Sequence, residues 1–258
     1  MTTMVRYPAS AQMGSARPHN GTSHPAPIFI VCSPNRRVGK TLLARLLAEY
    51  YSLAGDVIAF DFADEGPQLA DYLPQFTQVI DIGDIRGQMA FFDRLIVDSA
   101  TPKIIDLSHR VFRNFFTVVH QIGFFVELRR RSIEAFLLFM VDPDPRSAQA
   151  YALLRRWFIE ASLLPVRNRA VAKGVPYSDT FANASAMTIS LEIPMLSPSI
   201  KSLVDQKAFS FAEFRRGEYV HMPRRLQDDM QAWLNAVFLQ FREIELCLIS
   251  EQILASLQ

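Results

Sequence analysis

The sequence predicts a three-layer α/β fold, in which a mostly parallel β-sheet lies between two layers of helices. From Ile28 onward, short continuously apolar runs alternate with longer amphipathic segments. Continuous apolar runs are typical of strands that helices cover on both faces, because a strand with one wet face would alternate apolar and polar residues. Alternation of such strands with helices indicates a parallel sheet joined by helical crossovers. With 258 residues, 50% of them hydrophobic, the chain can bury the large core that this fold requires.

The first segment of the chain differs in composition from the rest. Residues 1–26 are rich in Ser, Thr, Pro, Gly, Ala and His, carry Arg6 and Arg17 without an acid, and have no hydrophobic period. They are predicted to be a disordered tail, either a solvated extension or a basic arm that touches nucleic acid or a partner. Residues 27–258 contain no internal repeat and no break in composition, so we expect them to form one domain.

The strands are predicted where apolar runs are short and bounded by polar or turn residues. In chain order they are Ile28–Cys32, Val57–Phe60, Gln78–Ile80, Lys103–Leu107, Ala135–Val141, Leu163–Val166 and Met187–Ile193. Apolar residues at helical spacing predict helices between and after these runs. The helices are Lys40–Ala54, Ile85–Ser99, Val111–Arg130, Arg146–Ala161 and a long final one from about Arg224 to Leu257.

The apolar stripe of the final helix is expected to pack on its own domain or in a dimer. A helix that lies on a membrane surface needs a Lys/Arg-rich polar face, and Glu243, Glu245 and Glu251 oppose one. No apolar stretch approaches the roughly 20 residues that span a bilayer, and a secretion signal is not recognisable. Cys32 and Cys247 have no neighbour at metal-ligand or redox spacing. We therefore expect a cytoplasmic protein with membrane contact unlikely.

The net charge gives no general affinity for polyanions, because 27 basic residues nearly cancel 26 acidic ones. Any contact with DNA would need local patches, which would bind phosphates without reading sequence. Acidic neighbours such as Glu127 and Glu213 favour ordinary ion-paired surfaces instead. The candidate basic patches are Arg129–Arg131, Arg155–Arg156, Arg215–Arg216 and Arg224–Arg225.

The connection between the first predicted strand and helix is a candidate phosphate-binding loop. It reads Ser33-Pro34-Asn35-Arg36-Arg37-Val38-Gly39-Lys40-Thr41. Gly39 would let backbone N–H groups close around an anion, and the helix from Lys40 would direct the positive end of its dipole at it. Lys40 would bridge the outer phosphates of a nucleotide, and the Thr41 hydroxyl would ligate Mg²⁺.

The match to the usual P-loop pattern G-x-x-x-x-G-K-[ST] is incomplete, because Pro34 stands in place of its first glycine. The strand, loop and helix context still favours nucleotide binding over an accidental Gly-Lys-Thr. Contacts with the nucleotide are expected from the consecutive residues Asn35, Arg36, Arg37, Val38, Gly39, Lys40, Thr41 and Leu42.

The segment from Asn35 to Thr41 resembles the deviant Walker A motif K-G-G-x-G-K-T of the ParA/MinD-like ATPases. This superfamily acts in plasmid and chromosome partition, in division-site placement and in plasmid transfer. Five later segments are similar to family segments in the same order, among them Leu137–Asp144 and Ser190–Pro194, and the resemblance covers roughly residues 28–214. The other three segments carry candidate site residues. They are Val57–Asp64, which resembles a strand ending in Asp-x-Asp, Ile104–Ser108, which contains a Walker-B-like Asp106, and Leu163–Arg169, which contains Asn168.

The resemblance implies ATP and Mg²⁺ as cofactors, with Thr41 and Asp106 on the magnesium side and Asn168 at the adenine. It also implies a nucleotide-dependent homodimer whose assembly switches the binding of a protein partner, with nonspecific DNA contact as an alternative. For hydrolysis it implies Lys40, Asp61, Asp64 and Asp106 as the catalytic set, with Ser108 and His109 in the switch II position.

Two departures from the family pattern leave alternatives open. Asn35 replaces the signature lysine that reaches the partner's phosphates, and Arg36 and Arg37 replace the two glycines after it. Either one of these arginines stands in for the lysine, or both are too bulky for a tight loop and leave a weak site. Ala63 occupies the place of the hydrolytic Asp, so which aspartate is catalytic stays open. The alternatives are an adaptor that binds nucleotide without hydrolysing it and a P-loop kinase or ligase acting on a small metabolite.

Overall fold

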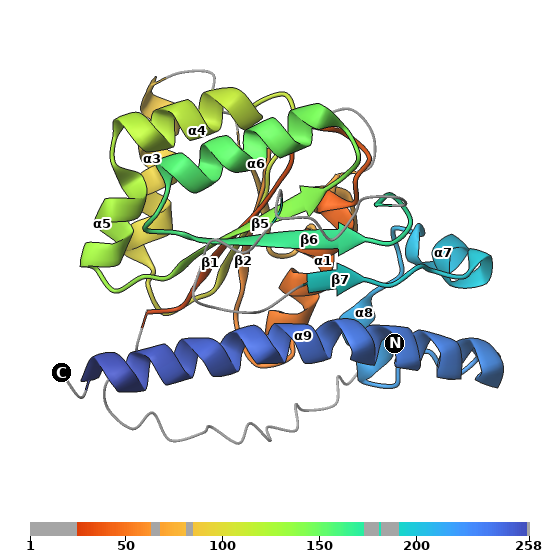
Figure 1. Cartoon of the computed structure of the whole chain (residues 1–258). Coiled ribbons are helices and arrows are strands. Elements are labelled where there is room, and N and C mark those ends of the chain that lie inside the picture. The colour runs from red at the N-terminus through yellow and green to blue at the C-terminus, as the bar shows by residue number, and fades with distance from the viewer. Residues whose placement is uncertain (1–24, 63–67, 81–84, 173–180, 182–190, 257–258) are drawn as a thin grey trace, which may run out of the picture.

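The computed structural model confirms the three-layer α/β fold (Figure 1). It describes residues 25–62, 68–80, 85–172, 181 and 191–256. Within these residues, seven parallel strands form one sheet in the order β3-β2-β4-β1-β5-β6-β7. The strands are β1 (Ile28–Cys32), β2 (Ile58–Phe62), β3 (Thr77–Ile80), β4 (Lys103–Asp106), β5 (Ala135–Val141), β6 (Ser162–Asn168) and β7 (Leu191–Ile193).

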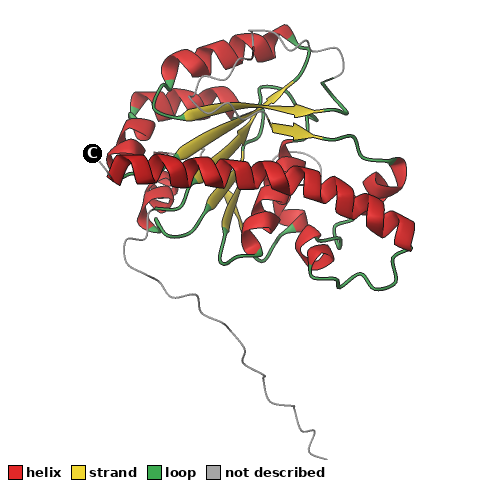
Figure 2. Cartoon of the chain, turned by 60° about the horizontal axis from the view of Figure 1, so that its bottom comes forward, coloured by secondary structure: helices red, strands yellow, loops and turns green. Residues whose placement is uncertain are grey.

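Helices cover both faces of the sheet. One layer consists of α3 (Ile85–Val97), α4 (Phe112–Gln121), α5 (Phe124–Arg130) and α6 (Pro145–Trp157). The opposite layer consists of α1 (Lys40–Ser52), α2 (Leu69–Tyr72), α7 (Pro198–Val204), α8 (Phe211–Arg215) and α9 (Arg224–Ser256). Figure 2 shows α9 running across the outside of its layer.

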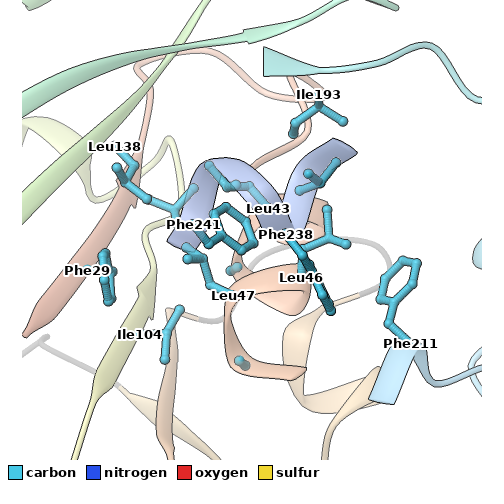
Figure 3. Packing of buried hydrophobic residues seen from close by; sticks show 14 of the residues in the cluster. Phe29, Leu43, Leu46, Leu47, Ile104, Leu138, Ile193, Phe211, Phe238 and Phe241 are labelled. Atoms are coloured by element: carbon cyan, nitrogen blue, oxygen red, sulfur yellow. The ribbon is translucent and has the colours of Figure 1, made fainter. Parts of the chain in front are cut away.

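The two layers explain why the central strands are apolar at every position. Phe29 and Val31 of β1 enter the cluster beneath α1 and α9, whereas Ile28 and Ile30 enter the cluster beneath α3–α6. Figure 3 shows part of the first cluster, in which Phe241 of α9 lies near Leu43 and Leu47 of α1. Successive side chains of a strand point to opposite faces, so a strand buried on both faces must be apolar throughout.

Several element boundaries differ from the predicted ones. The segment Val111–Arg130 is two helices, because Gly123 adopts a left-handed φ of 63° and ends the first one. The short helices α2, α7 and α8 were not predicted. Of the predicted strand Met187–Ile193, only the last three residues are described, and of the predicted tail residues 1–24 lie outside the described part. At the end of the predicted tail, the Ala26 N–H donates to the Ser99 carbonyl at 2.5 Å.

The edge of the sheet at β7 is covered by α9. The Gln240 side chain accepts from the Glu192 N–H at 2.6 Å and donates to the Glu192 carbonyl at 2.9 Å. This amide therefore satisfies the backbone groups that a further strand would otherwise pair. The Trp233 indole N–H adds a bond to the Pro194 carbonyl at 2.9 Å. No helix of the described chain combines the length and hydropathy needed to cross a membrane.

A buried ion pair fixes α1 to the segment that carries α7 and α8. Arg45 and Glu49 are almost wholly buried, and Arg45 Nε lies 3.0 Å from Glu49 Oε1. The Arg45 guanidinium also donates to the carbonyls of Val204 and Phe209. Glu49 accepts from the Ser210 hydroxyl and from the Ala212 N–H. Burial raises the pKa of the Glu49 carboxyl above its ordinary value.

Candidate functional site

The sheet topology creates a crevice at the carboxyl end of β1. β1 is followed by α1 on one face, whereas its neighbours β4 and β5 are followed by α4 and α6 on the other face. Connections that diverge in this way leave an opening beyond the strand ends, which is where open α/β sheets bind ligands. A cavity of about 490 Å³ lies there. Its lining residues are Arg36, Arg37, Gly39, Lys40, Thr41, Leu42, Asp61, Phe62, Gln68, Asp106, Ser108, His109 and Arg110.

The β1–α1 loop turns sharply just before α1. Gly39 precedes the 13-residue helix α1 and has a φ of 102°, a left-handed conformation that favours glycine. A Cβ at this position would lie 2.5 Å from Asn168 Nδ2, so a side chain would require Asn168 or the loop to move. Arg37 also has a positive φ, of 59°. The turn brings the first N–H groups of α1 and the positive end of its dipole to the cavity.

Lys40, Thr41 and Asp106, which the sequence predicted to act together, meet at this cavity. The Lys40 ammonium donates to the Asn35 carbonyl at 2.7 Å, inside the curve of the loop. The Thr41 hydroxyl donates to Asp106 Oδ2 at 2.6 Å, which joins the start of α1 to the end of β4. A hydroxyl beside a carboxylate is a pair of hard oxygen donors suited to a divalent cation.

Asp61 lies beside Asp106 on the neighbouring strand. The two residues are paired in the β2–β4 register, and both are buried. Ala59 and Ile104, two residues earlier, pack into the α1-side cluster, so both carboxylates point to the face where α1 begins. Asp61 Oδ2 also accepts from the Ala70 N–H at 3.0 Å and so contacts the start of α2. Two adjacent carboxylates repel each other, and a cation between them and a phosphate would relieve this repulsion.

The structure does not place every member of the predicted catalytic set. Ala63 and Asp64 lie outside the described residues, so the assignment of the hydrolytic aspartate stays a prediction. Ser108 and His109 do line the cavity. The described residues contain no group of three or more His, Cys, Asp or Glu side chains arranged to hold a metal ion. Magnesium commonly needs only one or two carboxylates when phosphates supply the other ligands.

The Asn35 side chain contacts Asp142 and Ser147 and does not line the cavity. Its amide donates to Asp142 Oδ1 and Oδ2, both at 3.1 Å, and to Ser147 Oγ at 3.2 Å. The Ser147 hydroxyl in turn donates to Asp142 at 2.7 Å. Asn35 therefore ties the loop to the end of β5 and the start of α6, a role that sequence reasoning missed. Arg36 and Arg37 are exposed at the cavity, where their guanidinium groups can approach an anion.

Asn168 supports the loop from the end of β6. Its amide donates to the Val38 carbonyl at 3.1 Å, and its Oδ1 accepts from the Ala170 N–H at 3.1 Å. A second, mainly apolar cavity of about 280 Å³ adjoins Asn168 and shares Thr41 and Leu42 with the first cavity. The other residues that line it are Arg45, Tyr72, Ala170, Ile193, Pro194, Leu196, Lys201, Val204 and Asp205.

Comparison with known proteins adds no assignment to this site. No protein-family model matches the chain, and no curated protein matches its sequence. Function is therefore inferred from the residues around the two cavities. Chemically, the first cavity offers a helix N-terminus, a lysine and three arginines for an anion, and two carboxylates with the Thr41 hydroxyl for a cation. The second cavity adds a mainly apolar space beside them.

Proposed function

We propose that this chain is a ParA/MinD-like P-loop protein that binds ATP with Mg²⁺ and uses the bound nucleotide as a switch. The observation that carries the proposal is the hydrogen bond from Thr41, next to Lys40 at the start of α1, to Asp106 at the end of β4. These residues come from sequence segments that match the two halves of a nucleotide site. Their meeting at one cavity supports the site more strongly than either motif does alone.

The residues of the loop would bind the phosphates as follows. Backbone N–H groups around Gly39 would donate to the phosphate oxygens, and the Lys40 ammonium would leave the Asn35 carbonyl to contact the outer phosphates. Thr41 and Asp106 would hold magnesium, which would neutralise part of the phosphate charge. The Thr41 hydroxyl, which now donates to Asp106, would have to turn a lone pair toward the cation.

The second cavity would receive the adenine. It is lined largely by apolar groups such as Leu42, Ile193 and Pro194, and it shares Thr41 with the phosphate cavity. An apolar slot beside a polar phosphate site suits a nucleotide, which has one flat ring and one highly charged end. Asn168 is one of the polar residues that line this cavity, and its amide group also holds the loop at the Val38 carbonyl.

Nucleotide-dependent dimerisation would follow if a second protomer contacts the bound phosphates. Asn35 is engaged with Asp142, so the exposed Arg36 and Arg37 are the loop cations that could reach across. A nucleotide that prefers the dimer would shift the affinity for a protein partner. Contact with DNA is the weaker alternative, because Arg130 and Arg131 of the largest basic cluster pair with Glu127.

The second candidate function is an adaptor that binds nucleotide without hydrolysing it. Ala63 at the hydrolytic position favours it, and so does the bond from the Ala70 N–H to Asp61, which gives that carboxylate a structural role. A steady-state phosphate-release assay separates the two functions. Turnover that is lost in Asp61→Asn or Asp64→Asn identifies an ATPase, whereas binding without turnover identifies the adaptor.

Replacing Lys40 with alanine is expected to weaken ATP binding by about one to two orders of magnitude, because the variant loses charge-assisted bonds to the phosphates. Isothermal titration calorimetry with magnesium present measures the change. Lys207→Ala is the matched control, since Lys207 is an exposed lysine paired with Asp71 and does not line either cavity. Equal affinity in wild type and Lys40→Ala would contradict the phosphate-site assignment.

A further inference from the structure

The outer face of α9 carries an apolar stripe with a seven-residue repeat. Leu239 and Leu246 are seven residues apart and are 60% and 54% exposed, and Ile249 is 52% exposed. Ala232 continues the repeat one step toward the N-terminus and is also exposed. The opposite face of α9 is buried in the core through Met230, Trp233, Leu234, Val237, Phe238, Phe241, Ile244 and Leu248.

Apolar side chains at this spacing favour contact with another helix over contact with water. Residues at seven-residue spacing remain on one side of a helix and form the seam of a helix pair. The outer face of a surface helix is mostly polar, so leucines that recur along one exposed line of α9 are a candidate seam. Figure 2 shows this helix crossing the front of the molecule. The exposure of Leu239 and Leu246 leaves room for a second helix along the stripe.

Charged residues on the two sides of the stripe indicate how two copies of α9 would be oriented if they paired. Arg242 and Glu243 follow Leu239 by three and four residues, so they lie on opposite sides of the leucine seam. In a parallel pair related by a two-fold axis along the helices, the Arg242 side of one copy faces the Glu243 side of the other. In an antiparallel pair, Arg242 would face Arg242 and Glu243 would face Glu243. Opposite charges thus meet only in the parallel arrangement.

We propose that α9 pairs in parallel with α9 of a second copy of this chain, through Leu239 and Leu246 and with reciprocal Arg242–Glu243 pairs. A single arginine beside the stripe does not make the Lys/Arg-rich face that a lipid surface requires. The same patch occurs on both subunits, as a two-fold interface requires. The interface is separate from the nucleotide cavity, so this dimer forms without nucleotide and does not depend on the proposed function.

The first test is the mass of the protein by light scattering and sedimentation without nucleotide. The wild type is expected to be a dimer, and Leu246→Ser is expected to weaken dimerisation at least tenfold. Leu153→Ser is the matched control, because Leu153 is an exposed leucine on α6. Lys40→Ala is expected to remain dimeric, which separates this interface from nucleotide-dependent dimerisation. A wild type that is monomeric throughout the micromolar range would overturn the proposal.

The second test concerns orientation. Arg242→Glu and Glu243→Arg each place like charges opposite one another in a parallel pair, so each is expected to weaken the dimer, and the double exchange is expected to restore it. Leu246→Cys in a Cys247→Ala background is expected to form a disulfide between two copies on oxidation. Cross-linking that instead requires Leu239→Cys on one copy and Leu246→Cys on the other would overturn the parallel arrangement. Circular dichroism verifies that each variant is folded.

Discussion

An Arg45→Ala variant is expected to lose about 3–5 kcal/mol of unfolding free energy. The change leaves the Glu49 carboxylate buried without its cation and removes the donor to the Val204 carbonyl. It also removes the guanidinium from the faces of Tyr72 and Phe211, where it lies 4.6 and 4.7 Å from the ring centroids. Urea denaturation followed by circular dichroism measures the loss.

The chain offers a matched control for this effect. Arg131 pairs with Glu127 at the same four-residue spacing, but the two side chains are 53% and 38% exposed. Arg131→Ala is therefore expected to change stability by only about 0.5 kcal/mol. The double variant Arg45→Met/Glu49→Leu should recover only part of the loss, because it removes both charges together but leaves the Val204 carbonyl and the Ala212 N–H without these partners. A loss in Arg45→Ala as small as that in Arg131→Ala would contradict the assigned role of the buried pair.

The loss of unfolding free energy in Arg45→Ala is also expected to depend on pH. Burial raises the pKa of Glu49 in the folded protein, and removing Arg45 removes a charge that lowers it. A carboxyl whose folded pKa is raised favours the folded state below its unfolded pKa of about 4.3, and this contribution is lost as the pH rises through the folded pKa. The variant should therefore be closer to the wild type at pH about 4 than at neutral pH.

Gly39→Ala is expected to weaken ATP binding at least about tenfold and to destabilise the fold by about 1–3 kcal/mol. The φ of 102° is unfavourable for alanine, and the added Cβ would meet Asn168 Nδ2 at 2.5 Å. Relieving that contact would move either the loop or the amide that braces it at Val38. Calorimetric titration and urea denaturation measure the two effects.

A Gly123→Ala variant measures the free-energy cost of a positive φ alone, without the steric clash that a Cβ makes at position 39. Gly123 also has a positive φ, of 63°, but nothing lies within 4 Å of a Cβ there. Its replacement should cost about 1–2 kcal/mol and leave nucleotide binding unchanged. If Gly39→Ala bound ATP as tightly as Gly123→Ala does, the tight loop would not be the phosphate site.

The sequence was most informative where burial alone decides the structure. Strands such as β1 and β5 are apolar on both faces, so their pattern predicted both their positions and the helices that cover them. The break at Gly123 was missed, because the apolar spacing continues from α4 into α5. The helix α8 has a local signal that was overlooked. Ser210 accepts from the Glu213 N–H at 3.1 Å, in a Ser-x-x-Glu sequence typical of a helix start.

The site was predictable where its residues follow strands whose carboxyl ends share one edge of the sheet, as Thr41 and Asp106 do. Gly39, Lys40 and Thr41 form one motif, and the strand before them fixes their place at the sheet end. The inward turn of Asn35 depends on Asp142, which is 107 residues away. The spacing of Arg45 and Glu49 in the sequence does not indicate that they are buried, because contacts with the distant segment around Ser210 help to bury them. Contacts of this kind depend on tertiary packing, which the spacing of residues in the sequence does not predict.

The most direct measurement of the central claim is calorimetric titration of the wild type with ATP, once with magnesium and once with a chelator. The wild type is predicted to bind ATP at least about tenfold more tightly with magnesium, because Thr41 and Asp106 would hold the cation beside the phosphates. Thr41→Val, which keeps the shape but not the hydroxyl, should lose this dependence. No ATP binding in either condition, or an affinity that neither magnesium nor Thr41→Val alters, would contradict a magnesium-nucleotide site at the β1–α1 loop.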